Sequence, residues 1–203
     1  MKKSGWMQRH VRDPFVQKAV KAGYRSRAAF KLMQIHEKEG LFKKGHWIID
    51  LGATPGGWAQ VVSKLVGSTG RVIALDRLPL IPIPGVIFIQ GDFLADSTLE
   101  TLRAVCPPKG VDWVISDMSP NLSGISDSDE ARMAELNEAT LALSLRLLKP
   151  KGGLLLKMFQ GSGFKAFQTL LQQHFNKVKT YKPDASRAES REVYLLAQGF
   201  KVV

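Results

Sequence analysis

The sequence has little of what a disulfide-linked, metal-binding or membrane-spanning protein needs. Cys106 is the only cysteine, which excludes a disulfide within the chain, and the four histidines lack metal-ligand spacing. No apolar run approaches the roughly 20 residues that cross a bilayer, and no charged segment followed by an apolar one resembles a signal peptide. We therefore expect a cytoplasmic protein with no structural metal site and no membrane anchor.

Repeats and linkers are also absent. No internal repeat and no long segment rich in Gly, Ser or Pro divides the 203 residues, and a composition of 44% apolar and 23% charged residues is that of an ordinary globular protein. A chain of this length buries a substantial core. We expect one domain over residues 1–203.

Positive charge is concentrated at one end of the chain. Residues 1–45 contain 12 Lys or Arg and three acids, whereas the remaining 158 residues contain 17 basic and 15 acidic residues. A local positive field concentrates polyanions, so we expect a basic N-terminal helical extension (about 1–45) that binds RNA. The alternatives are a solvated basic arm or an organellar presequence. Asp13-Pro14 is a helix-start signal, which favours folded protein.

Hydrophobic periodicity predicts helices alternating with strands. We expect helices over 15–22, 26–39, 58–66, 131–148 and 164–174, another beginning near Ser97, and strands over 47–51, 71–76, 86–90, 111–116, 154–159, 177–181 and 192–199. About ten residues separate the last two strands, too few for a helical crossover, so these two strands should form an antiparallel hairpin. The pattern indicates an α/β, Rossmann-like fold with a seven-stranded, mainly parallel sheet and one antiparallel strand.

A loop of small residues after the first strand predicts a cofactor site. It reads Asp50-Leu51-Gly52-Ala53-Thr54-Pro55-Gly56-Gly57-Trp58. The glycines allow a ligand close to the backbone, and the helix beyond presents free N–H groups. The spacing fits neither G-x-G-x-x-G nor a P-loop, because Trp58 stands where the P-loop lysine would be. We infer an adenosine carrier without pyrophosphate, S-adenosylmethionine, and a methyltransferase fold; the residues placed at this cofactor are Asp50, Gly52, Gly56, Gly57 and Trp58.

Acids follow the ends of three other strands. Asp76, about 20 residues beyond the glycine loop, is placed to accept hydrogen bonds from ribose hydroxyls, or else caps the next turn. Asp92 with Phe93 suits an adenine ring and its amine; alternatively, Asp92 caps the helix near Ser97. Asp117 should face the glycine loop across the cofactor, beside the reacting carbon.

Lys157 lies inside an apolar strand. Burying an ammonium group is costly unless it is paired or neutralised, so Lys157 should reach a wet cleft or a carboxylate and is a catalytic candidate. The alternative is a lysine that extends to the surface. Lys31 lies on a predicted helix, where a lysine is usually just solvated.

The segment that follows Asp117 disfavours two other methyl acceptors. Enzymes that methylate amino groups carry Asp or Asn, two prolines and an aromatic residue here, whereas this chain has one proline followed by Asn121. Enzymes that methylate carbon 5 of pyrimidines need a nucleophilic cysteine, and Cys106 lies before the strand 111–116.

These motifs together resemble the FtsJ-type ribose 2'-O-methyltransferases, the heat-shock ribosomal RNA methyltransferases of bacteria and their organellar relatives. The matching segments follow the family's order and cover essentially the whole chain: 25–32, 50–58, 91–93, 116–121, 157–161 and 186–194. The resemblance implies a Lys-Asp-Lys-Glu tetrad of Lys31, Asp117, Lys157 and Glu192, with Lys157 as proton acceptor. It also implies cofactor contacts by Gly56, Trp58, Asp76, Asp92 and Asp117. Thr54 and Ser119 replace alanines common in the family.

By this resemblance the substrate is a uridine of large-subunit ribosomal RNA in the assembled or maturing subunit, and we expect a monomer. The residues alone support an RNA hydroxyl, with phosphates held by the N-terminal helices, Arg187 and Arg191. Two other functions stay open: 2'-O-methylation of transfer RNA or an mRNA cap, and a non-enzymatic RNA-binding assembly factor.

The reaction requires aligned oxygen, carbon and sulfur atoms and removal of a poorly acidic proton. A lysine is a base only when neutral, a state that burial and a second lysine favour and that carboxylates oppose. Whether Lys157 takes the proton or stabilises the developing alkoxide is therefore open at this stage.

Overall fold

The computed structural model describes residues 13–121, 123–187 and 190–202. The first 12 residues of the expected basic extension lie outside the described residues. In chain order the elements are α2 (Pro14–Lys21), α3 (Ala28–Glu39), β1 (Trp47–Leu51), α4 (Gly57–Val66), β2 (Arg71–Asp76), β3 (Val86–Gln90), α5 (Asp96–Val105), β4 (Val111–Ser116), α6 (Ser126–Leu147), β5 (Leu148–Phe159), α7 (Phe164–His174), β6 (Phe175–Tyr181) and β7 (Glu192–Phe200).

One seven-stranded sheet has the order β3-β2-β1-β4-β5-β7-β6. Strand β7 pairs antiparallel with both β5 and β6, and the other pairings are parallel, which confirms the predicted sheet with one reversed strand. The order reverses direction between β1 and β4. A ligand crevice is expected outside the carboxyl ends of these two strands.

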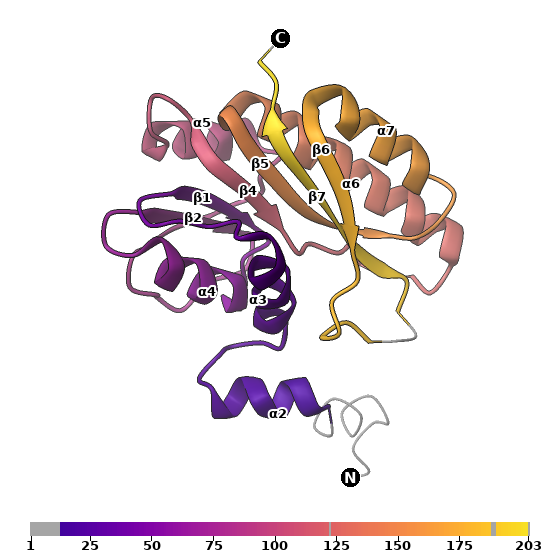
Figure 1. The fold of residues 1–203 in the computed structure, drawn as a ribbon, viewed down its shortest axis with the longest axis horizontal. Helices are drawn as coiled ribbons and strands as arrows, with labels where there is room; N and C mark the ends of the chain where they lie inside the picture. Colours follow the sequence, from indigo (N-terminus) through magenta and orange to yellow (C-terminus); the bar gives the residue numbers. More distant parts are fainter. Residues whose placement is uncertain (1–12, 122, 188–189, 203) are drawn as a thin grey trace.

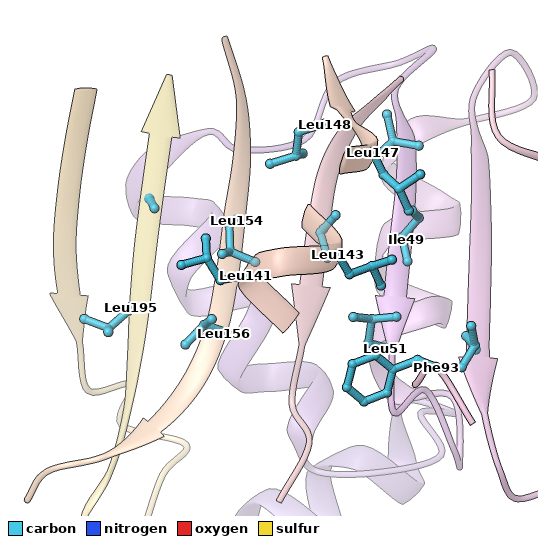
Figure 2. Packing of buried hydrophobic residues seen from close by; sticks show 14 of the residues in the cluster. Ile49, Leu51, Phe93, Leu141, Leu143, Leu147, Leu148, Leu154, Leu156 and Leu195 are labelled. Carbon is cyan, nitrogen blue, oxygen red and sulfur yellow. The ribbon is translucent and has the colours of Figure 1, made fainter. Parts of the chain in front are cut away.

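Helices cover both faces of the sheet, with α3 and α4 on one face and α6 and α7 on the other (Figure 1). Side chains alternate along a strand, so Ile48 joins the core under α3 and α4, whereas Ile49 and Leu51 join the core under α5, α6 and α7 (Figure 2). This burial on both faces explains why the central strands read as continuous apolar runs. None of the helices in the described ranges is long and apolar enough to cross a membrane.

Helix α2 lies beyond α3, away from the sheet (Figure 1), and begins at the predicted signal. The carboxylate of Asp13 accepts the N–H of Phe15 at 2.9 Å, and Pro14 takes the first helical position. Asp13 also pairs with Arg27 at the start of α3 and lies 3.9 Å from Arg187 in the loop between β6 and β7. One acid therefore joins three segments that are far apart in the sequence.

Helix α6 begins at Ser126 instead of residue 131, so the predicted start of this helix is wrong. Asp127 and Asp129 lie in the first turn, where carboxylates stabilise a helix N-terminus. The carboxylate of Asp129 also accepts the N–H groups of Ser123 and Gly124 at 2.7 and 3.1 Å. The start of α6 was missed because its acids make the segment polar, and a polar segment can be either a loop or the first turn of a helix.

Strand β5 begins at Leu148 instead of residue 154, so its predicted start is wrong, because residues 148–153 also belong to the strand. The pairing with β4 shifts between Val111–Leu148 and Trp113–Gly153, and Lys151 has a φ of 66°. The Pro-Lys-Gly segment 150–152 therefore forms a β-bulge within β5. A Cβ at Gly153 would lie 2.3 Å from the ring of Trp113, which accounts for glycine there.

Candidate active site

A cavity of about 350 Å³ opens beyond the carboxyl ends of β1, β2 and β4, at the reversal of strand order. Its size is within the range of small-molecule sites. Five of the predicted cofactor residues line it, and they are Gly52, Asp76, Asp92, Phe93 and Asp117. Gly52 has a φ of 70°, and a Cβ there would lie 2.2 Å from Met118, so only glycine lets the loop turn into the cavity.

Asp76 is held in place by two backbone donors. Its carboxylate accepts the N–H groups of Thr54 and Leu78 at 2.9 and 2.8 Å, which joins the glycine loop to the end of β2. The geometry fits both readings made from the sequence, since the same carboxylate caps a turn and faces the cavity. Its ribose contact remains a prediction.

Asp92 does not cap α5 directly, because the N-cap of that helix is Ala95. Its Oδ1 accepts the N–H of Leu94 at 3.0 Å, and its Oδ2 lies 3.9 Å from Arg77. The ring of Phe93 is buried beside it, between the cavity and the core. An acid and an aromatic ring thus face the cavity together, as an adenine site requires.

The four residues of the predicted tetrad lie together, although they come from α3, β5, β7 and the end of β4. Lys157 Nζ is 3.3 Å from Asp117 Oδ1 and 3.6 Å from Glu192 Oε1, and it donates to the backbone oxygen of Asp117 at 2.7 Å. Lys31 Nζ is 3.2 Å from Glu192 Oε2. Both lysine residues are buried, with 7% and 5% exposed, so the cost of burying each ammonium is offset by carboxylates.

Asp117 belongs to both the tetrad and the cavity lining. Burial alone would raise the pKa of its carboxyl group, but the charges of Lys157 and Lys31 and hydrogen bonds from Tyr194 and Lys157 hold that pKa below its ordinary value. The hydroxyl of Tyr194 donates to Asp117 Oδ1 at 2.6 Å. Burial, together with the charge of Asp117, raises the pKa of Tyr194 well above its usual range, so this phenol remains a donor.

The chemistry of the cavity fits S-adenosylmethionine better than a pyrophosphate cofactor. Three carboxylates line it, from Asp76, Asp92 and Asp117, together with two guanidinium groups, from Arg77 and Arg132, so acidic groups outnumber basic ones and disfavour phosphates. They suit a ligand that presents a sulfonium, an ammonium group, ribose hydroxyls and an adenine amine. Among the described residues no group of three or more His, Cys, Asp and Glu is arranged to hold a metal ion.

Comparison with known proteins agrees with this geometry. The sequence pattern of the FtsJ-like methyltransferases matches residues 24–200. The chain belongs to the FtsJ-like methyltransferase family. It is a methyltransferase that uses S-adenosylmethionine.

Proteins named ribosomal RNA large subunit methyltransferase E resemble this FtsJ-like methyltransferase over nearly their full length. The one from Marinobacter nauticus is 48% identical over 197 residues, covering 97% of this chain and 95% of its own, and the one from Azoarcus sp. is 50% identical over 191 residues, covering 94% and 93%.

Solved structures agree on the fold. A ribosomal RNA methyltransferase from Plasmodium falciparum has a TM-score of 0.80 at 30% identity, covering 87% of this chain and 98% of its own. Fibrillarin from Aeropyrum pernix, solved with natively bound S-adenosyl-L-methionine, has a TM-score of 0.58 at 18% identity, covering 86% and 75%. The latter supports the fold only.

Four predicted cofactor residues do not line the cavity of this FtsJ-like methyltransferase. Trp58 is buried, and its Nε1 donates to the carbonyl of Ala28 at 2.8 Å. Gly56 faces the side chains of Ile83, Arg25 and Leu80, and Gly57 faces that of Ser26. The structure gives these three residues packing contacts, and their cofactor contacts remain predictions.

Asp50 is the fourth of these residues. It is 1% exposed in β1, and its Oδ2 has no hydrogen-bond partner in the described part of the chain. Burial raises the pKa of the Asp50 carboxyl group well above its ordinary value, and the charges of Asp117 and Asp76 raise it further. A hydrogen bond from the N–H of Ala59 acts in the opposite direction. The carboxyl group of Asp50 therefore favours its neutral form. Its contact with the cofactor remains a prediction.

Sequence reasoning assigned no role to several residues that the structure places in or beside the site. Those in the cavity lining include Arg77, Leu94, Met118, Arg132 and Leu136. Arg77 and Met118 directly follow predicted site acids, so their positions were a usable signal. Residues on α6 gave none, because only the folded chain brings that helix to the strand ends.

Proposed function

We propose that this methyltransferase transfers the methyl group to the 2'-hydroxyl of a uridine in large-subunit ribosomal RNA. The observation that carries the proposal is the meeting of Lys31, Asp117, Lys157 and Glu192 at the edge of the cofactor cavity. The relatives named ribosomal RNA large subunit methyltransferase E support the choice of RNA.

Bound S-adenosylmethionine supplies an activated methyl group. Asp76 and Asp92 would hold its ribose and adenine, and Asp117 would face its positive end. Lys157 would contact the attacking 2'-oxygen and, once its own ammonium group has lost a proton, would take the hydroxyl proton as the carbon–oxygen bond forms and the carbon–sulfur bond of the donor breaks. Glu192 lies near both lysines and would fix their positions, so that the hydroxyl is aligned before the proton leaves.

The RNA would approach over α2 and the loop between β6 and β7. Lys18 and Lys21 lie in the last turn of α2. Arg191 pairs with Glu130 at 2.5 Å, and Arg187 lies near Asp13. If these arginines bind RNA, a phosphate would replace the carboxylate as the partner of each guanidinium group. The basic extension supports this path, because 12 of the 29 Lys and Arg residues lie in residues 1–45.

Large ribosomal subunits from cells lacking the gene, incubated with the protein and labelled S-adenosylmethionine, test the proposal. Nuclease digestion and mass mapping should locate one methylated ribose, on a uridine. Transfer RNA and capped RNA in parallel reactions should accept no methyl group. Label on a base, or labelling confined to transfer RNA or the cap, would contradict it.

The setting of the reaction is part of the same proposal. We expect a monomer that acts in the cytoplasm on the assembled or maturing subunit, since the named relatives act on ribosomal RNA. Sedimentation of the pure protein, and a comparison of naked RNA with intact subunits as substrate, measure these two points. A stable dimer, or equal rates on both substrates, would contradict them.

A further inference from the structure

The segment 77–85 begins with Arg77, which lines the cofactor cavity, and it has few backbone hydrogen bonds of its own. It includes Pro79, Pro82 and Pro84, which have no N–H to donate. Its carbonyls are instead bound by side chains from elsewhere: Thr54 Oγ1 donates to Leu78 and Pro79 at 3.2 and 3.4 Å, and Ser63 Oγ donates to Pro84 at 2.7 Å. Side chains of other segments therefore fix the position of this loop.

Arg25 holds the middle of this loop. Its guanidinium donates to the carbonyls of Ile81 and Pro82 at 2.6 and 3.0 Å and to that of Pro55 in the glycine loop at 3.3 Å. A planar fork can reach several carbonyls at once, which a single ammonium cannot. One side chain therefore joins the glycine loop to the loop 77–85.

The glycine pair of the cofactor loop makes room for this contact. A Cβ at Gly56 would lie 3.0 Å from Arg25 Nη1 and 2.8 Å from Ile83, and the φ of Gly56 is 110°. A Cβ at Gly57 would lie 2.2 Å from Ser26 Oγ. Both glycines thus admit neighbouring residues of the segment that leads into α3, the helix that carries Lys31.

The backbone of Arg25 is fixed as well. Its N–H donates to Gln60 Oε1 at 2.9 Å, and Gln60 Nε2 donates to the carbonyl of Gly23 at 3.1 Å. The base of the arginine is thereby anchored on α4. Arg77, the first residue of the held loop, and Asp76, the residue before it, line the cavity, so movement of the loop would change the wall that faces the cofactor.

We propose that Arg25 is a positioning residue, which locks the loop 77–85 against the glycine loop and so preorganises the cofactor cavity. Its charge is used on backbone carbonyls instead of RNA phosphates. The inference concerns the cofactor side of the enzyme and does not depend on which RNA is methylated.

Binding of S-adenosylhomocysteine to Arg25→Lys, measured by calorimetry without RNA, tests this. Lysine keeps the charge and loses the fork, so affinity should fall about tenfold. Amide hydrogen exchange should quicken at Leu78 and Val86, whose N–H groups are hydrogen-bonded at the two ends of the loop, and stay unchanged in the rest of the strands. With RNA present, KM for the cofactor should rise in proportion while kcat at saturation changes little. Arg25→Ala should repeat these effects.

Arg71→Lys is the matched control. Arg71 also donates to loop carbonyls, those of Ser68 and Gly70, but at the amino end of β2, so its replacement should leave cofactor affinity unchanged. Unchanged affinity in folded Arg25→Lys overturns the proposal. Two further results also overturn it: weakened RNA binding with normal cofactor binding, which would make Arg25 a phosphate ligand, and loss of protection throughout the chain, which would make it a general packing residue.

Discussion

Asp117 belongs both to the lining of the cavity and to the predicted tetrad. It lines the cavity, lies 3.3 Å from Lys157 and accepts a hydrogen bond from Tyr194. An acid with these partners stays ionised, because both lysines and the phenol favour its anion. The tetrad is thus a charge cluster in which each buried ion has an opposite charge nearby.

Tyr194→Phe should weaken this cluster without removing a charge. The folded-state pKa of Asp117 lies below its unfolded value, so its contribution to stability is present above that unfolded value, near pH 4, and is lost as the pH falls through the folded value. Without the phenol the folded pKa rises, and the acid transition should begin at a higher pH. We expect a loss of about 1 kcal/mol at neutral pH, measured by urea unfolding between pH 3 and 7. If the unfolding free energy of the variant falls with decreasing pH over the same range as that of the parent protein, this hydrogen bond does not have the proposed role.

At this scale the sequence predicted the surroundings of charged residues better than those of glycines. A carboxylate partner for Lys157 could be predicted because a lysine in an apolar strand needs one, whereas the position of Glu192 beside it followed only from family resemblance. Gly56 and Gly57 belong to a recognisable loop, but a motif does not distinguish a glycine that a cofactor requires from one that a neighbouring side chain requires. Gly56 lies against Ile83 and Arg25, and Gly57 lies against Ser26.

The contact between α4 and the start of α3 sets the position of Lys31 relative to the cofactor loop. Gly57→Ala should destabilise the fold by about 1–3 kcal/mol, because its Cβ would lie 2.2 Å from Ser26 Oγ. Removing that oxygen in Ser26→Ala/Gly57→Ala should restore much of the loss. A double-mutant cycle by thermal unfolding measures the coupling. Additive effects of the two changes would show that these residues do not press on each other.

Asp129 should determine where α6 begins. Asp129→Ala removes the acceptor for the N–H groups of Ser123 and Gly124, and also a carboxylate from the first helical turn. We expect the helix to fray to about residue 131, which amide hydrogen exchange would detect as lost protection at residues 129–134, whose N–H groups donate to the carbonyls of the helix start. Asp127→Ala, in the same turn, is the control and should have a smaller effect. Equal protection in both variants would contradict the assignment.

The strand ends were the most predictable elements, because apolar runs ended by an acid or glycine mark them clearly. The beginnings of α6 and β5 were not predictable. One depends on hydrogen bonds from a neighbouring loop, and the other on a bulge that lets a Pro-Lys-Gly segment continue a strand. Both are tertiary effects that a local pattern does not contain.

At the scale of the whole molecule, the charge of +11 predicts salt-sensitive RNA binding. Replacing Lys18 and Lys21 by Gln should weaken RNA binding and reduce the slope of log affinity against log salt by about 2. Lys109 and Lys151 are the control pair, because they are exposed near the amino ends of β4 and β5, away from the carboxyl ends where the cavity lies. Their replacement should change the slope less. Filter binding over a salt series measures both. Equal slopes in the two double variants would contradict an RNA path over α2.

Transfer by Lys157→Met, in a single turnover on large ribosomal subunits, tests the central claim most directly. Lys165→Met, at an exposed position on α7, is the matched control. We predict a rate lower by roughly 10²- to 10⁴-fold for Lys157→Met, with unchanged binding of S-adenosylhomocysteine and RNA, and a normal rate for the control. A Lys157→Met protein that folds, binds both ligands and still methylates a ribose at the normal rate would contradict the account.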